Sequence, residues 1–325
     1  MNKYKFLLVG ALVLALAACG DEKQTDTTEA NLTPTTQHQE TKDKVALSET
    51  VKFEDALGKV HEFTEVPTSV ATLNPGIMDI LVELAANVTG RPTISSDMKS
   101  NIEAIQEIGN PHEPSFEQII ALNPEVLIVP TSFQRFAATV EATGIEIIYE
   151  NMDSIKGIQQ TISRYGEVFS NTDKAKELNT EIDEAIAKSS TSTKNALIVY
   201  GAPGTYLAAL NNSLYGDILT AAGGNNIAAN FPALDKYPTY ANISTEKIVQ
   251  QNPQVVMLIT HSNPEAIKAG FEKQMNENAA WKNLDAVKNN QIIMLPAELF
   301  DNPGTQVVEA LDYMRELLEK TETAN

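Results

Sequence analysis

Residues 115–131 read SFEQIIALNPEVLIVPT, and residues 244–260 repeat the pattern as STEKIVQQNPQVVMLIT. Seven of the seventeen aligned positions are identical, and Glu117 and Glu246 share the common offset (246 − 117 = 129). In each copy a helical pattern ends at an Asn-Pro pair. A short apolar run follows, typical of a strand that is buried in a parallel sheet. Ser115 opens the first helix with a capping-box pattern. The repeat therefore predicts two similar lobes.

The fold class follows from the alternation of strands and helices in both halves of the chain. This order predicts an α/β protein with two Rossmann-like lobes and parallel sheets. An opening hairpin is expected over Val51–Phe63, with its turn at residues 56–59, and His61 on its second strand is expected to be exposed. Between the lobes, Ile155–Phe169 and Lys174–Ala187 have helical periodicity with few breakers. The lobes are therefore expected to be bridged by a long rigid helix.

The N-terminus predicts the compartment. Lys3 and Lys5 precede an apolar stretch over residues 6–18, which has the length of a secretory signal and is too short for a transmembrane span. Residues 16–19 read LAAC, a lipobox that makes Cys19 the expected lipidated residue. We therefore expect a lipid-anchored protein on the extracellular face of the cell membrane. With Cys19 used by the lipid, no other cysteine is left for a disulfide or a metal site.

The segments after the lipobox differ in composition. Polar residues dominate as far as residue 48, and such a segment cannot bury enough apolar surface to offset its ordering entropy. The expected organisation is a lipoprotein signal peptide at 1–19, a flexible tether at 20–48, an N-terminal α/β lobe at 49–153, a bridging helical segment at 154–192 and a C-terminal α/β lobe at 193–325.

Charge and motifs exclude several classes of function. The net charge of −19 argues against binding to nucleic acid, whose phosphates require the opposite sign. No Gly-x-Ser-x-Gly elbow, Walker loop, Gly-x-Gly-x-x-Gly or His-Glu-x-x-His motif occurs, so the chain is not expected to be an enzyme. A lipid-anchored hydrolase remains as a remote alternative, and it would need a third catalytic partner beside His112 or His261.

Two histidines flank the repeat copies. His112 lies just before the first copy, and His261 immediately follows the second. Imidazole binds haem iron, zinc and copper, and two histidines on opposed lobes can fill both axial positions of a haem. A closed zinc site usually needs four protein ligands. Only His61 would add a third imidazole in the folded body, although Glu113 is a further candidate, so zinc stays open.

The paired glutamates have two interpretations. Glu117 and Glu246 occupy the first turns of equivalent helices, where the helix dipole alone is a sufficient reason for an acidic residue. One exposed carboxylate per lobe is also suited to pair with arginines of a two-fold symmetric partner.

Several further stretches carry a family resemblance. Together with the lipobox, the hairpin turn and the repeat, the chain resembles the helical-backbone class of substrate-binding lipoproteins, which serve ABC importers of siderophores, cobalamin and haem. The additional stretches are residues 108–111 (IGNP), 221–226 (AAGGNN) and 281–290 (WKNLDAVKNN). Within that class the chain is most similar to the haem-binding lipoproteins of Gram-positive iron-regulated surface determinant systems. This similarity rests on residues 107–114 (EIGNPHEP), 153–157 (DSIKG), 175–179 (AKELN) and 201–207 (GAPGTYL).

The resemblance implies a class III substrate-binding fold and haem as the bound ligand. In that family the N-terminal lobe typically supplies a Met where this chain has His112, and the C-terminal lobe supplies a His at the position of His261. This chain therefore departs from the pattern, and bis-histidine ligation is implied. Arg91 and the loop at Gly204 are expected near the haem propionates, and Tyr206 is expected to line the pocket.

The resemblance also implies partners. Glu117 and Glu246 match the positions that dock onto arginines of an ABC importer permease, and surface proteins that donate haem are further expected partners. The alternative is a ferric-siderophore or cobalamin receptor. Siderophore anions would require several basic or aromatic side chains in the cleft, and this chain is poor in Trp and Arg.

Overall fold

The computed structural model describes residues 44–94, 102–188 and 193–320. Cys19 and the predicted signal peptide lie outside the described residues. The first strand, β1 (Ala46–Glu54), begins inside the segment that was predicted to be a tether. Among the described helices, none is both long and apolar enough to cross a membrane.

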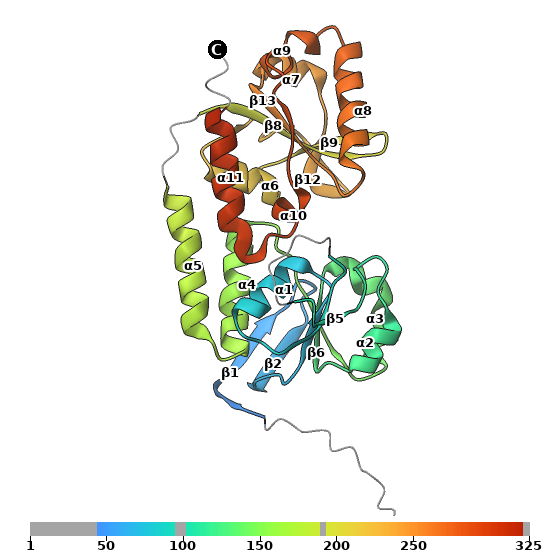
Figure 1. The fold of residues 1–325 in the computed structure, drawn as a ribbon, viewed down its shortest axis with the longest axis vertical. Coiled ribbons are helices and arrows are strands. Elements are labelled where there is room, and N and C mark those ends of the chain that lie inside the picture. Colours follow the sequence, from blue (N-terminus) through green and yellow to red (C-terminus); the bar gives the residue numbers. More distant parts are fainter. Residues whose placement is uncertain (1–43, 95–101, 189–192, 321–325) are drawn as a thin grey trace, which may run out of the picture. The chain divides into compact units, whose positions relative to one another are not determined.

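The first sheet has five strands, all parallel, in the order β5-β4-β3-β6-β7 (Figure 1). The strands are β3 (Val70–Thr72), β4 (Val88–Arg91), β5 (Gln106–Glu107), β6 (Val126–Val129) and β7 (Glu146–Tyr149). The helices between them are α1 (Pro75–Glu83), α2 (Phe116–Leu122), η1 (Thr131–Phe136) and α3 (Ala137–Glu141). The apolar run of the first repeat copy is the buried strand β6, as the sequence predicts.

The second sheet has seven strands in the order β11-β12-β9-β8-β13-β14, with β10 paired to β8. The strands are β8 (Asn195–Ala202), β9 (Thr205–Ala209), β10 (Asn225–Asn226), β11 (Ala233–Leu234), β12 (Tyr237–Asn242), β13 (Val255–Ile259) and β14 (Ile292–Met294). The helices are α6 (Leu214–Ala221), α7 (Thr245–Gln251), α8 (Pro264–Glu277), η2 (Trp281–Asn283), α9 (Asp285–Lys288), α10 (Ala297–Phe300), η3 (Gly304–Gln306) and α11 (Val307–Lys320). β8, β10, β13 and β14 pair in parallel, whereas β9, β12 and β11 add an antiparallel edge that the repeat did not predict.

The two repeat copies adopt the same local structure. α2 and α7 begin and end at positions that differ by the common offset (245 − 116 = 129 and 251 − 122 = 129). Asn123 and Asn252 end these helices in the left-handed conformation, with φ of 43° and 42°. Asn tolerates this region because its short polar side chain can bond locally. The prediction of two similar α/β lobes is therefore confirmed.

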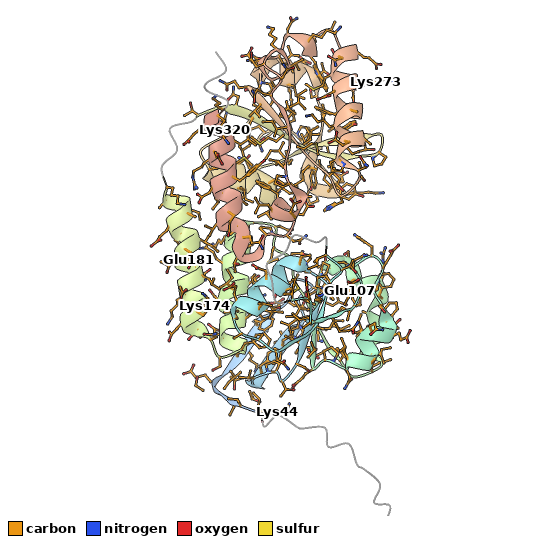
Figure 2. The ribbon with its side chains drawn as sticks, viewed as in Figure 1. Lys44, Glu107, Lys174, Glu181, Lys273 and Lys320 are labelled. Atoms are coloured by element: carbon orange, nitrogen blue, oxygen red, sulfur yellow. The ribbon has the colours of Figure 1, made fainter. Side chains whose placement is uncertain are left out.

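Two helices join the sheets. α4 (Ile155–Val168) and α5 (Thr172–Ala187) pack against each other, and the chain reverses between them at residues 169–171. The side chain of Asn171 donates to the carbonyl of Leu84 beside the first sheet, and Lys188 pairs with Asp312 on α11 at 2.7 Å. α5 therefore runs from the first lobe to the second, with Lys174 and Glu181 along its length (Figure 2). The predicted long bridge consists of this helix and the packed α4.

The buried apolar residues form three clusters. One cluster lies over one face of each sheet and continues through α1, α4, α5, α6 and α11. The second covers the other face of the second sheet, and the third covers the other face of the first sheet. Because the first cluster contains residues of both lobes and of the bridging helices, opening the lobes would expose apolar surface.

Close backbone packing also holds α1 against the start of α11. Gly304 has a φ of 56°, and a Cβ at this position would lie 2.5 Å from the carbonyl oxygen of Gly76. Only glycine allows both the conformation and the approach. Asp79 on α1 accepts hydrogen bonds from the amide and the hydroxyl of Thr305.

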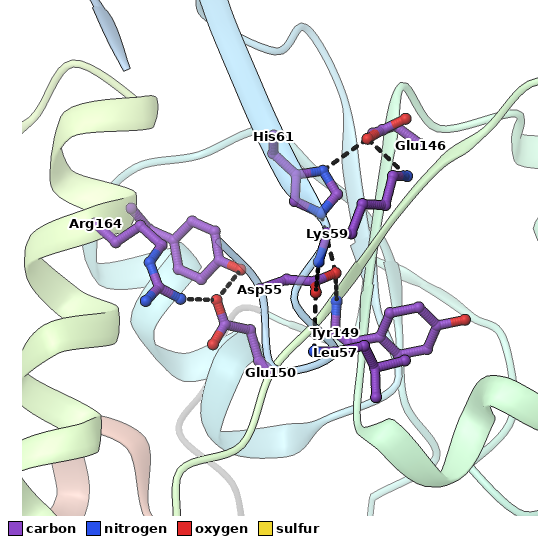
Figure 3. A network of polar contacts seen from close by, with 9 residues as sticks. Asp55, Leu57, Lys59, His61, Glu146, Tyr149, Glu150 and Arg164 are labelled. Atoms are coloured by element: carbon purple, nitrogen blue, oxygen red, sulfur yellow. Dashed lines mark hydrogen bonds and ion pairs between the residues drawn. The ribbon is translucent and has the colours of Figure 1, made fainter. Parts of the chain in front are cut away.

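The N-terminal hairpin of β1 and β2 (Val60–Glu65) is attached to the first lobe by a polar network (Figure 3). His61 is buried, and not exposed as its strand position suggested. Its Nε2 lies 3.0 Å from Asp55, and its Nδ1 lies 2.6 Å from Glu146 at the start of β7. Lys59 pairs with the same glutamate at 3.0 Å.

Candidate ligand-binding site

Two cavities lie at the carboxyl ends of strands from both sheets, and we refer to them together as the cleft. They have volumes of about 190 Å³ and 280 Å³ and share Asp301 and Asn302 in their walls. Most of the residues that line them follow β3, β4, β6 and β7 in the first lobe and β13 and β14 in the second, and the start of α6 and part of β12 complete the wall. These residues include Asn74, Thr93, Pro130, Glu150, His261 and Ala297. The carboxyl edge of parallel strands is the usual ligand-binding edge of open α/β sheets.

His261 presents its imidazole to the larger cavity. Its side chain is 58% exposed, and its Nδ1 lies 2.8 Å from Oδ2 of Asp301, whose side chain is 10% exposed. The hydroxyl of Tyr215 donates to the other carboxylate oxygen at 2.6 Å. Asp301 thus uses one oxygen for each partner. Because Nδ1 faces the carboxylate, Nε2 is left available to a ligand, the arrangement common for metal-binding histidines.

The contact with Asp301 also changes the acid–base behaviour of His261. The hydrogen bond to this carboxylate raises the pKa of His261 above its ordinary value of 6.5, and burial opposes part of the rise. A carboxylate partner fixes the ring orientation and makes the imidazole a stronger electron donor to a metal.

Three tyrosines surround this pair. The ring of Tyr200 lies 5.7 Å from that of His261 and 5.7 Å from that of Tyr240. Burial first, and then the charge of Asp301, raises the pKa of Tyr200 above its ordinary value. Burial first, and then the charge interaction with Tyr200, raises the pKa of Tyr240 to about 12. The pKa of Tyr215 is raised further, by burial first and then by the charge of Asp301. These hydroxyls therefore stay protonated at neutral pH, and that of Tyr215 donates to Asp301. His261 is the better metal ligand of the group.

The cleft wall carries an unusual balance of charge. Glu150, Asp153, Glu298 and Asp301 line the two cavities, and none of the described lining residues is Lys or Arg. Two of these four carboxylates already have partners, since Glu150 pairs with Arg164 and Asp301 with the imidazole of His261. An extended anionic ligand would find no Lys or Arg among the described lining residues, whereas His261 offers a nitrogen to a metal ion.

His112 lies in the exposed loop between β5 and α2. Its amide donates to the side chain of Asn110, and its carbonyl accepts from Arg135 at 3.4 Å. The loop borders the cleft through Thr93, which donates from its amide to the carbonyl of Gly109 and lines the cavity of His261. The imidazole of His112 does not line either cavity among the described residues.

The other predicted contact residues are placed away from these cavities. Arg91 bonds the carbonyl of Pro92 and pairs with Glu107 at 3.3 Å (Glu107 is labelled in Figure 2). Gly204 is the turn between β8 and β9, with a φ of 75°. Tyr206 donates its hydroxyl to the carbonyl of Ile267 and so attaches β9 to α8. Gly204 and Tyr206 line a separate groove of about 470 Å³.

A closed zinc site is not formed by the described residues. Within their ranges, no group of three or more His, Cys, Asp or Glu side chains is arranged to hold a metal ion. His61, counted as a third imidazole from the sequence, is buried in the hairpin network. The described part of the cleft thus offers one oriented imidazole.

Glu117 and Glu246 are both exposed in the first turns of α2 and α7. Each helix runs antiparallel to the strand that follows it, so its N-terminus lies at the carboxyl edge of its sheet, the edge that also carries the cleft. Within the described ranges, neither carboxylate forms a hydrogen bond or ion pair with another side chain.

Asp301 and Tyr215 were not identified from the sequence. Asp301 lies forty residues after His261 in the stretch Phe300-Asp301-Asn302-Pro303-Gly304, which has the composition of an ordinary turn. Tyr215 lies in the first turn of α6, where an aromatic residue usually indicates packing. Only the folding of both segments onto the end of β13 brings them to His261.

Comparison with known proteins identifies the family of the chain. The periplasmic binding protein family matches residues 70–299. The high-affinity heme uptake system protein IsdE of Staphylococcus aureus is 32% identical over 242 residues, which span 72% of this chain and 79% of IsdE.

Solved structures agree with this match. The S. aureus IsdE complex with heme has a TM-score of 0.66 at 27% identity and covers 77% of this chain and 98% of that one. An ABC transporter substrate-binding protein from Listeria monocytogenes has a TM-score of 0.67 at 26% identity, covering 78% and 99%. The petrobactin-binding protein YclQ of Bacillus subtilis shares the fold, with a TM-score of 0.64 at 22% identity, covering 84% and 98%. The chain belongs to the periplasmic binding protein family and is a substrate-binding component of transport, not an enzyme.

Proposed function

We propose that this protein binds haem in the cleft and delivers it to an ABC importer. The observation that carries the proposal is the oriented imidazole of His261. Its Nδ1 is held by Asp301, so its Nε2 is available to iron. The similarity to IsdE, a heme uptake protein, supports haem as the ligand.

The surroundings of His261 suit a flat apolar ligand. Pro75, Ile94 and Ala297 line the same cavity, and the ring of Tyr200 lies beside the imidazole. We propose His112 as the second iron ligand, because its loop borders this cavity through Thr93. Haem supplies a ferric or ferrous iron that takes two axial donors, and imidazole is a common one. The protein holds the ligand and performs no chemistry on it.

The oriented imidazole of His261 supports haem over the siderophore alternative. The fold is shared with a petrobactin-binding protein, so the fold alone does not choose between them. Haem iron takes axial donors from the protein, and the imidazole of His261 can supply one. An anionic ferric siderophore would instead call for several basic side chains, and none of the described lining residues is Lys or Arg. The imidazole and the apolar residues beside it favour a ligand bound through its iron and its apolar face.

An absorption titration with ferric haem tests this function. We expect one haem per chain and a low-spin, six-coordinate spectrum. His261→Ala should lose that spectrum or become five-coordinate, and so should His112→Ala, because each variant removes one axial donor. Ser262→Ala is the matched control, since it changes the neighbouring residue and leaves the imidazole and its carboxylate in place.

The outcomes of the titration separate the alternatives. Unchanged spectra in His112→Ala alone would remove His112 from the ligand set and leave haem binding through His261. The absence of a saturable change in the unmodified protein would refute haem binding, and a parallel titration with ferric petrobactin would then test the siderophore alternative.

We also propose that Glu117 and Glu246 dock onto basic residues of the importer permease. We further propose that Cys19 carries the lipid that anchors the protein on the extracellular face of the cell membrane. The exposure of both carboxylates at the cleft edge of their sheets supports the first proposal. The lipobox at residues 16–19 supports the second. Surface proteins that donate haem are proposed as further partners.

A further inference from the structure

The equivalent helices α2 and α7 each leave one large apolar side chain exposed at the same position of the repeat. Ile119 and Ile248, related by the repeat offset (248 − 119 = 129), are buried in the lobe cores. The next residues, Ile120 and Val249, are 41% and 38% exposed, although both are large and apolar. Neither belongs to a buried apolar cluster, so neither stabilises its lobe by core packing.

Each of these apolar residues lies beside one of the exposed glutamates. Ile120 follows Glu117 by three positions, and Val249 follows Glu246 by three. Residues three apart are neighbours on a helix surface. Each lobe therefore presents the same pair, a carboxylate and a branched apolar side chain one turn away, at related places on related helices.

We propose that these four residues form a paired docking surface for a two-fold symmetric partner, each half of which offers a basic side chain beside an apolar depression. The proposal rests on the proposed docking of Glu117 and Glu246 to the permease. It adds one apolar contact in each lobe, at positions related by the repeat. The carboxylates guide the first encounter with the partner and its orientation, because exposed charges act at a distance. Added salt weakens this effect. Burial of Ile120 and Val249 supplies an attraction that salt does not weaken.

The same features argue against a second copy of this chain as the partner. Two such surfaces placed face to face would oppose carboxylate to carboxylate, and the chain as a whole carries a net charge of −19. The complementary partner is basic at two related points, and the repeat within this chain matches a dimer of identical subunits.

The direct test is binding to the permease–ATPase complex of the source organism in lipid nanodiscs, with empty nanodiscs as the reference. The full chain carries Cys19→Ser, so that no lipid anchor contributes, and no haem is added. Three double variants are compared with it. They are Ile120→Thr with Val249→Thr, Glu117→Gln with Glu246→Gln, and the control Val82→Thr with Ile186→Thr. The control residues are also exposed, at 40% and 37%, and lie on α1 and α5.

We expect the Ile120→Thr/Val249→Thr variant to bind about tenfold more weakly than the control, the effect of losing two apolar contacts at an interface. Its affinity should still fall with added KCl, because its carboxylates remain. The Glu117→Gln/Glu246→Gln variant should bind weakly with little dependence on KCl. Threonine keeps the β-branched shape, and a thermal melt of each variant confirms that it is folded.

Two results would overturn the proposal. One is binding of the Ile120→Thr/Val249→Thr variant within twofold of the control, which would leave the glutamates as the whole contact. The other is no binding of the unmodified surface to the complex. Because no haem is present, neither result depends on haem as the ligand, and the absorption titration fails or succeeds separately.

Discussion

The proposed function depends at the residue scale on how Asp301 holds His261. The imidazole is more than half exposed, whereas the carboxylate beside it is nearly buried and also accepts from Tyr215. An exposed side chain loses rotamer freedom when it binds a ligand, and a buried partner that fixes its ring beforehand reduces that cost. Asp301 is therefore a positioning residue for the proposed iron ligand.

The effect of Asp301 is measurable without haem. In the ligand-free protein, NMR titration of the His261 ring should give a pKa above 6.5, and Asp301→Asn should lower it. Because the pKa is raised in the folded state, the interaction stabilises the fold fully below pH 6.5 and is lost as the pH rises through the folded pKa.

The control for this titration is Glu298→Gln, which changes another carboxylate of the same cavity that does not pair with His261. It should leave the pKa of His261 nearly unchanged. An equal pKa in Asp301→Asn and the unmodified protein would show that Asp301 does not position the ring.

At the same scale, residue type and position were enough to place His261 at the ligand-binding edge of the second sheet, but not to identify its partner. A histidine directly after a buried strand points to the ligand-binding edge of a sheet. Asp301 reaches it only because α10 and the following turn fold back on the end of β13, a long-range contact with no local pattern. Arg91, Gly204 and Tyr206 came from the resemblance alone, and the structure engages Arg91 and Tyr206 in local contacts outside the cleft.

At the scale of elements, the repeat could be predicted because each copy contains its own signals. The Asn-Pro pair ends the helix, and the apolar run after it is removed from water only when the strand is buried. Both helices end where these signals place them. The cap of the first helix differs from expectation. Ser244 caps α7 through the amide of Lys247, whereas the side chain of Ser115 makes no cap bond.

The hairpin shows why burial was harder to predict than strand position. Its turn was predicted by composition, and Gly58 there has a φ of 84°. His61 is held by Glu146 at the start of β7, which lies more than eighty residues later in the chain. A hairpin pattern alone contains no information about which of its faces a distant element will cover.

The polar network of the hairpin predicts a dependence of stability on pH. Burial raises the pKa of Asp55, but hydrogen bonds from His61 and three backbone amides outweigh it, and the net pKa lies below its ordinary value of 3.8. Asp55→Asn should lower the free energy of unfolding at pH 7 by about 1–3 kcal/mol, the usual cost of a disrupted buried polar group. Urea unfolding measures this difference.

The sign of the pH effect follows from the depressed pKa. The stabilisation by Asp55 is present above the unfolded pKa near 3.8 and is lost as the pH falls through the lower folded pKa, so the two proteins should converge below pH 3.8. Asp183→Asn, an exposed change on α5, is the control and should have little effect. A difference that stays constant as the pH falls well below 3.8, through the range of the lowered folded pKa, would rule out the carboxylate as its source.

At the scale of the whole described molecule, the two lobes are held in one arrangement. A single apolar cluster continues from the first sheet through α4 and α5 to the second, and Gly76 and Gly304 pack backbone against backbone. These contacts agree with the rigid bridge expected from the helical pattern between the lobes. The cleft is therefore largely formed before a ligand binds, and only small adjustments of its lining are expected.

The most direct test of the account is the position of iron in crystals of the haem-loaded protein, measured by anomalous scattering at the iron edge. We predict a single strong peak in the cleft, within coordination distance of Nε2 of His261, with Asp301 still bonded to Nδ1. A strong iron peak at any other place, with His261 free of it, would contradict the proposal that this cleft binds haem through His261.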